Sequence, residues 1–181
     1  MRNGIRICKP TSVTYSGTSA SIVGQGSVEV SACTSVSLNG VFSSDFDNYM
    51  IVVRGTSSAG VGLGIRLRTS GTDATATNYT RQTLNAYGTT VNGARATSDS
   101  RFSGGDLYNT QRGGFIHHLY GPYLSQPTAH RMVSSVDYLS ATIFDASGTH
   151  SLSTSYDGFT LYLISAGPNI TGQLAVYGLV D

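Results

Sequence analysis

Histidines offer this chain its widest range of chemistry, because imidazole serves as a metal ligand and as an acid or base near neutral pH. The sequence has four: His117, His118, His130 and His150. His117 and His118 are adjacent in a stretch that alternates like a β-strand, so they point to opposite faces and cannot ligate one metal ion together. His117 shares its face with Phe115 and Leu119, as a buried sheet histidine would. His130 and His150 lie near the ends of expected strands, without ligand spacing between them. We therefore expect no metal site at the histidines.

Acidic and hydroxyl side chains offer two further kinds of chemistry. Asp45, Asp47 and Asn48 present oxygen ligands of the kind calcium binds, or else they cap a turn that enters the following strand. We expect the capping role and no bound metal or cofactor. Serines are plentiful, but no GxSxG context for a nucleophile is present. Gly60, Gly62 and Gly64 precede no helix, so they do not form a phosphate loop. We expect no catalytic residue and no enzymatic activity.

Tyrosines are the most suggestive candidates for binding. The chain has 11 tyrosines and no tryptophan, and tyrosine supplies flat, amphipathic contact area. Four residues lie in or beside the loop-rich middle of the chain and are candidates for a surface that binds a glycan: Tyr108, Arg112, Tyr120 and Tyr123. The alternative is that the tyrosines fill sandwich edges and subunit interfaces, and we favour this alternative.

Residues 42–83 set the fold class. In residues 49–54, Tyr49, Ile51 and Val53 share one face and apolar residues occupy part of the other, which is typical of a central, buried strand. Residues 61–68 alternate strictly, with Val61, Leu63, Ile65 and Leu67 on one side, as in a half-buried strand. The opposite side carries Gly62 and Gly64 as open positions, followed by Arg66 and Arg68. We expect these two strands to form an antiparallel hairpin.

The other expected strands are separated by turn residues every 8–15 positions. They comprise residues 12–16, 20–23, 27–32, 34–38, 82–87, 90–97, 115–120, 128–138, 158–165 and 170–180, with a hairpin turn at 24–26. Residues 103–114 are the longest loop candidate, and residues 139–150 are a turn-rich passage. Without a helix or an internal repeat, the pattern favours an all-β, two-sheet antiparallel sandwich that is jelly-roll-like.

Composition supports a sheet protein and excludes several partners. Charged residues make up 12% of 181 residues and the net charge is +1. Lys9 is the only lysine and Glu29 the only glutamate, whereas surface helices are normally rich in both. No basic run exists to bind nucleic acid, and no apolar stretch is long enough to span a membrane or to act as a signal peptide. We expect one soluble domain at residues 12–181.

The central segments also resemble a known group of proteins. VFSSDFDNYMIVV (residues 41–53), IRLRTSGTDATATNY (65–79) and GQLAVYGL (172–179) together resemble small structural proteins of tailed bacteriophages, especially phages of cyanobacteria and marine bacteria. The resemblance covers most of the chain from about residue 34. It implies a virion protein of the tail fibre, minor tail or capsid decoration type, assembled in the host cytoplasm beside other virion proteins. The alternative is a receptor- or carbohydrate-binding module at a fibre tip, in contact with a host surface glycan.

The N-terminus and the sheet edges bear on assembly. Residues 1–11 show no regular period, and Pro10 stops strand extension, so we expect an attachment arm in which Arg2 and Arg6 meet acidic sites on a partner. Cys8 and Cys33 either pair or stay free, and we favour free thiols. With one lysine and four prolines, the chain has few means of guarding exposed strand edges. We expect a homo-oligomer, and the phage resemblance implies a trimer.

Overall fold

The computed structural model describes residues 4–109, 111–136 and 142–180, and the described chain is all-β. The first seven strands are β1 (Ile5–Ile7), β2 (Ser12–Val23), β3 (Ser27–Asn39), β4 (Asn48–Ser57), β5 (Val61–Thr69), β6 (Thr72–Asp73) and β7 (Tyr79–Tyr87). The next seven are β8 (Thr90–Asp99), β9 (Phe102–Leu107), β10 (Gly113–Tyr120), β11 (Thr128–Val136), β12 (Thr142–His150), β13 (Gly158–Leu163) and β14 (Ile170–Leu179). No helix in the described ranges is long and apolar enough to cross a membrane.

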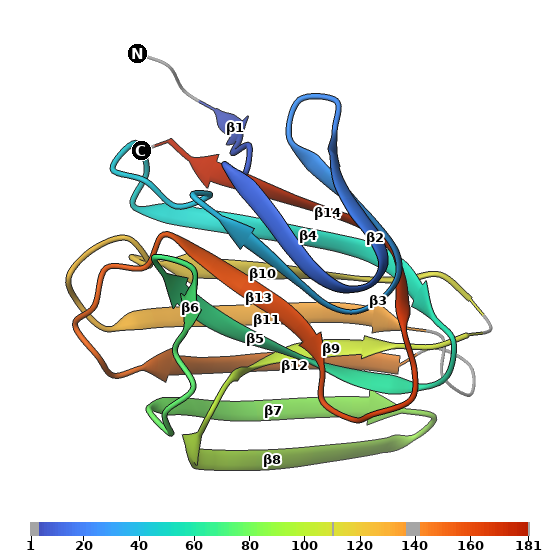
Figure 1. Ribbon diagram of the computed structural model, residues 1–181. Helices are drawn as coiled ribbons and strands as arrows, with labels where there is room; N and C mark the ends of the chain where they lie inside the picture. The colour runs from blue at the N-terminus through green and yellow to red at the C-terminus, as the bar shows by residue number, and fades with distance from the viewer. Residues whose placement is uncertain (1–3, 110, 137–141, 181) are drawn as a thin grey trace.

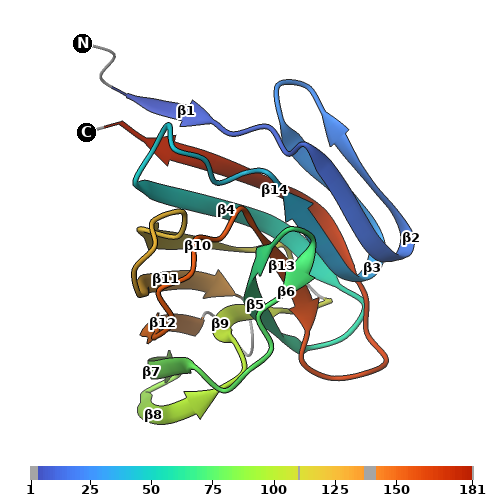
Figure 2. The same cartoon turned by 60° about the vertical axis from the view of Figure 1, so that its left-hand side comes forward.

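The strands form one antiparallel sheet that curls over on itself into two layers (Figure 1). The larger layer runs in the order β14-β4-β10-β11-β12-β7-β8. The smaller layer contains β13 and β5, with β6 and β9 along the free side of β5. Strand β3 joins the layers, because one part of it pairs with β14 and the other with β13. Figure 2 shows the smaller layer lying across the larger one. The predicted two-layer sandwich is confirmed.

Apolar residues from both layers fill the space between them. Tyr49, Ile51 and Val53 point inward from β4, and the alternating residues from Val61 to Leu67 point inward from β5. Aromatic rings dominate two regions of this core. Phe42 and Tyr49 lie 4.8 Å apart between ring centroids, and Tyr79 meets Phe102 edge-on at 4.9 Å. The predicted inward faces of both strands are therefore confirmed.

The expected hairpin of β4 and β5 is wrong. Strand β4 lies between β14 and β10, whereas β5 pairs with β13, β6 and β9. The short connection after Ser57 carries the chain from one layer to the other, so the two apolar faces meet across the core. The outward glycines of β5 are also covered. A Cβ at Gly62 would lie 2.7 Å from Ile164, and one at Gly64 would lie 2.6 Å from Arg101.

Two segments predicted as loops are strands. Residues 103–107 belong to β9, which is buried between β5 and the larger layer. Residues 142–150, which include the sequence Asp145-Ala-Ser-Gly148, form β12 between β11 and β7. Gly148 suits the crowded position it holds there, because a Cβ would lie 1.9 Å from the Thr80 carbonyl oxygen. Close packing, not a turn, therefore explains the glycine at position 148. Residues 137–141, part of the predicted strand 128–138 and of this passage, lie outside the described residues.

The four short strands predicted before residue 39 are the halves of two long ones. Strands β2 and β3 pair from Ser12↔Asn39 to Val23↔Ser27, with the predicted hairpin turn at residues 24–26. A bulge at Ser16 and Gly17 interrupts the alternation, and Ala32 on the partner strand has φ 47°. The break in periodicity that separated the predicted segments is this bulge.

The expected N-terminal arm lies against the sandwich where it is described. Residues Ile5–Ile7 form β1, which pairs with β14, and the Cys8 N–H donates to the Val176 carbonyl. The Arg6 guanidinium lies 5.6 Å from the centre of the Phe46 ring, and Pro10 is buried. Arg2 lies outside the described residues. The attachment role of this segment stays a prediction.

Candidate functional site

The most distinctive surface of the molecule is the outer face of β10, β11, β12, β7 and β8. Cross-strand partners share a face, and the register places Ile116 opposite Val133, and Ile143 opposite Ala86, which in turn faces Val91. Five large apolar side chains on this face are exposed: Ile116 at 40%, Val133 at 44%, Leu84 at 54%, Ile143 at 63% and Val91 at 64%. We refer to these five residues as the apolar patch.

A polar row crosses the same face beside the apolar patch. The register aligns His118, Arg131, Ser147, Gln82 and Arg95 across the five strands. Arg131 forks onto Asp145, with Nη2–Oδ2 at 2.6 Å and Nε–Oδ1 at 3.3 Å. This hydrogen bond raises the pKa of the exposed Arg131 guanidinium, so Arg131 stays charged.

The outer face is hollowed along this row. One hollow of about 460 Å³ is lined by Gln82, Leu84, Gly93, Arg131, Asp145 and Ser147. A second of about 310 Å³ shares Gln82 and Ser147 and adds Arg95 and Gly148. Both open to solvent, and the side chains offer amide, hydroxyl, guanidinium and carboxylate groups. Together they form a shallow groove with hydrogen-bonding capacity.

Three of the histidines lie on the opposite, inner side of this layer, and two of them pack together. His117 and His130 are 0% and 2% exposed, and their rings lie 5.8 Å apart between centroids. Neither nitrogen of the His130 ring has a hydrogen-bond partner among the described residues. His150 packs at 4.2 Å from the Tyr79 ring. The sequence prediction placed His117 correctly in the core, but it missed that His130 and His150 join it.

The buried histidines His117 and His130 are held in the neutral form, because their pKa values are lowered. Burial lowers the pKa of His117 well below its usual value, and the neighbouring His130 lowers it further. Burial alone lowers the pKa of His130 to about 3. The described residues contain no group of three or more His, Cys, Asp or Glu side chains that could hold a metal ion. Asp45 and Asp47 are exposed, and the Asp45 N–H is capped by the Ser43 hydroxyl at 3.3 Å.

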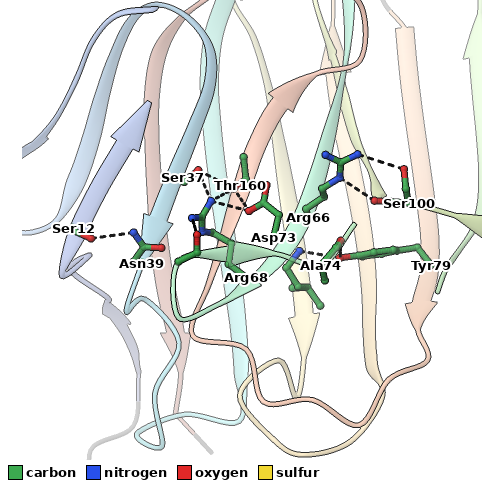
Figure 3. Close-up of polar contacts among 12 residues, drawn as sticks. Ser12, Ser37, Asn39, Arg66, Arg68, Asp73, Ala74, Tyr79, Ser100 and Thr160 are labelled. Carbon is green, nitrogen blue, oxygen red and sulfur yellow. Dashed lines mark hydrogen bonds and ion pairs between the residues drawn. The ribbon is translucent and has the colours of Figure 1, made fainter. Parts of the chain in front are cut away.

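A polar network closes one end of the smaller layer (Figure 3). The Arg68 Nη1 donates to Asp73 Oδ1 at 2.7 Å, to Ser37 Oγ at 2.7 Å and to Thr160 Oγ1 at 2.6 Å. Its Nη2 donates to the Gly71 carbonyl. Nearby, the Tyr79 hydroxyl accepts from the Leu67 N–H at 3.1 Å and donates to the Ala74 carbonyl at 3.0 Å. These groups bond to one another across β3, β13, β5 and β6, so they hold the fold together. Arg68, expected on an open face, is buried.

The predicted binding residues do not form one site. Tyr108 follows β9 and Arg112 precedes β10, whereas Tyr120 and Tyr123 lie at or beyond the other end of β10. That strand has eight residues, which corresponds to on the order of 25 Å. Tyr120 is 44% exposed, while Tyr123 packs partly against the core and its carbonyl accepts from the Ser155 hydroxyl.

Arg112 lines a different hollow, of about 340 Å³, at the junction of β2, β3, β14 and β4. Arg54 contributes there through Nε and Nη2, which donate to Gln173 Oε1 at 3.2 and 2.9 Å. Glu29 and the hydroxyls of Ser19, Ser21 and Ser31 complete it.

Cys8 and Cys33 are both free thiols.

Sequence reasoning missed the apolar patch because it assigned all of β12 to a turn-rich passage and did not give the strand order. The alternation that marks β12 is weak, with Ile143 exposed and only Phe144 and Ala146 as inward apolar residues. Val91 and Leu84 were each visible as apolar residues, but only the strand order places them beside Ile143.

The sequence matches no family model and no curated protein. Among solved structures, the chain is similar to domain 4 of AbnA, an extracellular arabinanase of glycoside hydrolase family 43 from Geobacillus stearothermophilus, solved with arabinotriose. The alignment has 14% identity and a TM-score of 0.38, and it covers 94% of this chain and 83% of that domain. A likeness at this level assigns neither a substrate nor a partner to the present chain.

Proposed function

We propose that this chain is a non-enzymatic β-sandwich module that assembles into a larger particle by covering its apolar patch with a neighbouring protein. The observation that supports the proposal is the exposure of Leu84, Val91 and Ile143 at 54–64% on one face. Exposed apolar patches beside polar residues mark interaction surfaces, and in this patch Asp145 lies between Val133 and Leu84. The particle we propose is the virion of a tailed bacteriophage, as the sequence resemblance implies, assembled in the host cytoplasm.

A passive role agrees with the arrangement of the titratable groups. The histidines with lowered pKa values face the core, away from both hollows of the groove. In the groove, the Asp145 carboxylate is already bonded to Arg131. A general acid or base must reach its substrate within hydrogen-bond distance, and the groups that line the groove supply no free pair for this purpose.

The experiment compares a patch variant with a matched control in the assembled particle. Leu84→Ser with Ile143→Ser removes two exposed side chains of the apolar patch, and Ile164→Ser removes one that is 47% exposed elsewhere. We expect the patch variant to fold but to be lost from purified particles, and the control to be retained. Electron microscopy of particles that carry the wild-type chain then locates it on head or tail. Retention of the patch variant at wild-type level would refute the proposal.

A second candidate function is glycan binding in the groove. Gln82, Arg131, Asp145 and Ser147 offer donors and acceptors around an open volume of about 460 Å³, which suits the hydroxyls of a sugar. A glycan array tests it with three variants: Arg131→Ala for the groove, Arg112→Ala for the hollow at β2 and β3, and Tyr108→Ala for the residue beside Gly60. Loss of signal with Arg131→Ala alone would assign the site to the groove. Absence of any wild-type signal would exclude this function.

A further inference from the structure

Strand β8 is a long strand edge that the structure leaves open. Among the described strands with a single partner, β1 has three residues and β6 has two. Strand β2 is interrupted by its bulge, and β9 is buried. Strand β8 has ten residues, eight of them exposed, and among the described strands it pairs only with β7. Its one bulge falls near Tyr79, so the pairing from Gln82↔Arg95 to Tyr87↔Thr90 is regular.

The turn between β7 and β8 determines which backbone groups of β8 point outward. Tyr87 and Thr90 flank a two-residue loop, Gly88-Thr89, in which Gly88 has φ 55°. Such loops close on a hydrogen-bonded pair, and bonded and non-bonded pairs then alternate. Asn92 and Ala94 therefore bond to β7, and the Thr83 hydroxyl, which donates to the Ala94 carbonyl, agrees with this orientation. The N–H and C=O groups of Val91, Gly93 and Arg95 face away from the sheet.

We infer that β8 pairs in antiparallel fashion with β8 of a second copy of this chain, about a two-fold axis near Gly93. This inference rests on the proposed function, because it names a neighbour that meets the sheet at the β8 edge of the apolar patch. Exposed, unpaired N–H and C=O groups are completed by another strand. Pairing about Gly93 places Arg95 opposite Val91 of the other copy, so no like charges are directly opposed.

A copy of the same chain suits this edge better than an unrelated strand. The outer face of β8 carries Val91, and Ile143 lies two strands away in the same row. Two-fold pairing therefore joins the apolar patches of both copies into one face, as an isologous contact does. Arg95 is the only charge between Thr90 and Thr97, and the net charge of the chain is +1, so two copies repel each other weakly.

Gly93 allows a test that removes one backbone N–H. Gly93→Pro deletes the outward N–H, and proline is tolerated on an edge strand where the missing donor faces solvent. Gly93→Ala is the matched control, since it keeps the N–H and its Cβ meets the Thr83 carbonyl oxygen at 3.6 Å and Gln82 Nε2 at 4.0 Å, both ordinary contacts. Two N–H groups are lost per two-fold dimer, so we expect Gly93→Pro to weaken dimerisation by about thirtyfold and Gly93→Ala to leave it unchanged within about twofold.

The assay is the mass of the full-length protein across a concentration series, by sedimentation or native mass spectrometry. A wild-type dimer that Gly93→Pro alone dissociates supports the inference. A monomer at all concentrations overturns it, and so does a trimer, which no two-fold contact alone produces. Neither result removes the proposed function, which the Leu84 and Ile143 variant tests in the particle. If Gly93→Pro does not fold, hydrogen exchange of the wild type decides instead. The Val91, Gly93 and Arg95 amides must become protected as concentration rises, and unchanged exchange overturns the inference.

Discussion

The buried pair of His117 and His130 predicts that this protein loses stability in mild acid. Both rings are enclosed in the core, and the His130 nitrogens have no hydrogen-bond partner among the described residues, so the folded state holds both rings in the neutral form. In the unfolded chain each histidine takes up a proton with a pKa of about 6.5. Acid therefore favours the unfolded state, because only that state binds the extra protons. These histidines therefore leave the free energy of unfolding at its full value above pH 6.5, and they lower it progressively as pH falls toward 3.

The size of the effect follows from the His130 pKa of about 3 in the folded state. At pH 5 the folded state still leaves His130 neutral, whereas the unfolded state lies about 1.5 pH units below its pKa of about 6.5. At about 1.4 kcal/mol per unit, His130 alone lowers the free energy of unfolding by about 2 kcal/mol between pH 8 and pH 5. His117 acts in the same direction.

The assay is urea unfolding at a series of pH values for the wild type and for His117→Leu with His130→Leu. A matched control is His118→Gln, which lies on the same strand but on the outer side. The comparison between variants is needed because burial raises the pKa of the Asp106 carboxyl, and that shift stabilises the folded state in acid. Between pH 8 and pH 5, we expect the free energy of unfolding of the double variant to fall by at least about 2 kcal/mol less than that of the wild type. We expect that of the control to fall as much as that of the wild type.

Two results would refute this reasoning. One is a double variant whose stability falls between pH 8 and pH 5 as steeply as that of the wild type. The other is a folded-state NMR titration in which the His130 ring takes up a proton near pH 6. Either result would mean that water or a polar partner reaches the pair in the folded protein.

Three further predictions concern the rest of the fold. Tyr79→Phe leaves the buried Leu67 N–H without its acceptor, so thermal or urea unfolding should show a loss of about 1–3 kcal/mol, whereas Tyr15→Phe, at an exposed tyrosine, should change nothing measurable. Arg68→Met breaks the pair in which the Arg68 and Asp73 side chains are 10% and 22% exposed, at an expected cost of about 3 kcal/mol. Arg54→Met on the surface should cost less than about 0.5 kcal/mol, and equal effects of the two would refute a structural role for the network. Overnight EDTA should leave the melting curve unchanged; a drop reversed by calcium would assign Asp45 and Asp47 as ligands.

The sequence predicts the class of fold because its strongest signals are local. The alternation of Val61, Leu63, Ile65 and Leu67 requires a half-buried strand, and the structure buries all four. The two apolar faces of β4 predict a central strand, and β4 lies between two partners. These patterns depend only on the two-residue period of a strand, which is a property of neighbouring residues.

Strand order depends on contacts between residues far apart in the sequence, and the wrong predictions follow from that. The short connection between β4 and β5 has the same length as a hairpin turn, yet it crosses between layers. Glycine and aspartate in β12 have turn-forming types, but Gly148 is there because Thr80 lies too close for a side chain. The apolar patch depends on which strands are neighbours, and so does the meeting of His117 with His130. Neither could be predicted before the pairings were known.

The position of β14 has a consequence for synthesis of the protein. This strand comes last in sequence order among the described strands, yet it lies between β4 on one side and β1 and β3 on the other. On the ribosome, β3 and β4 emerge long before the strand that joins them. Completion of the larger layer must therefore wait until residues 170–179 have emerged. Until then the edges of β3 and β4 that pair with β14 are open to other strands. A nascent chain that stalls before residue 170 is therefore a candidate for binding by a chaperone.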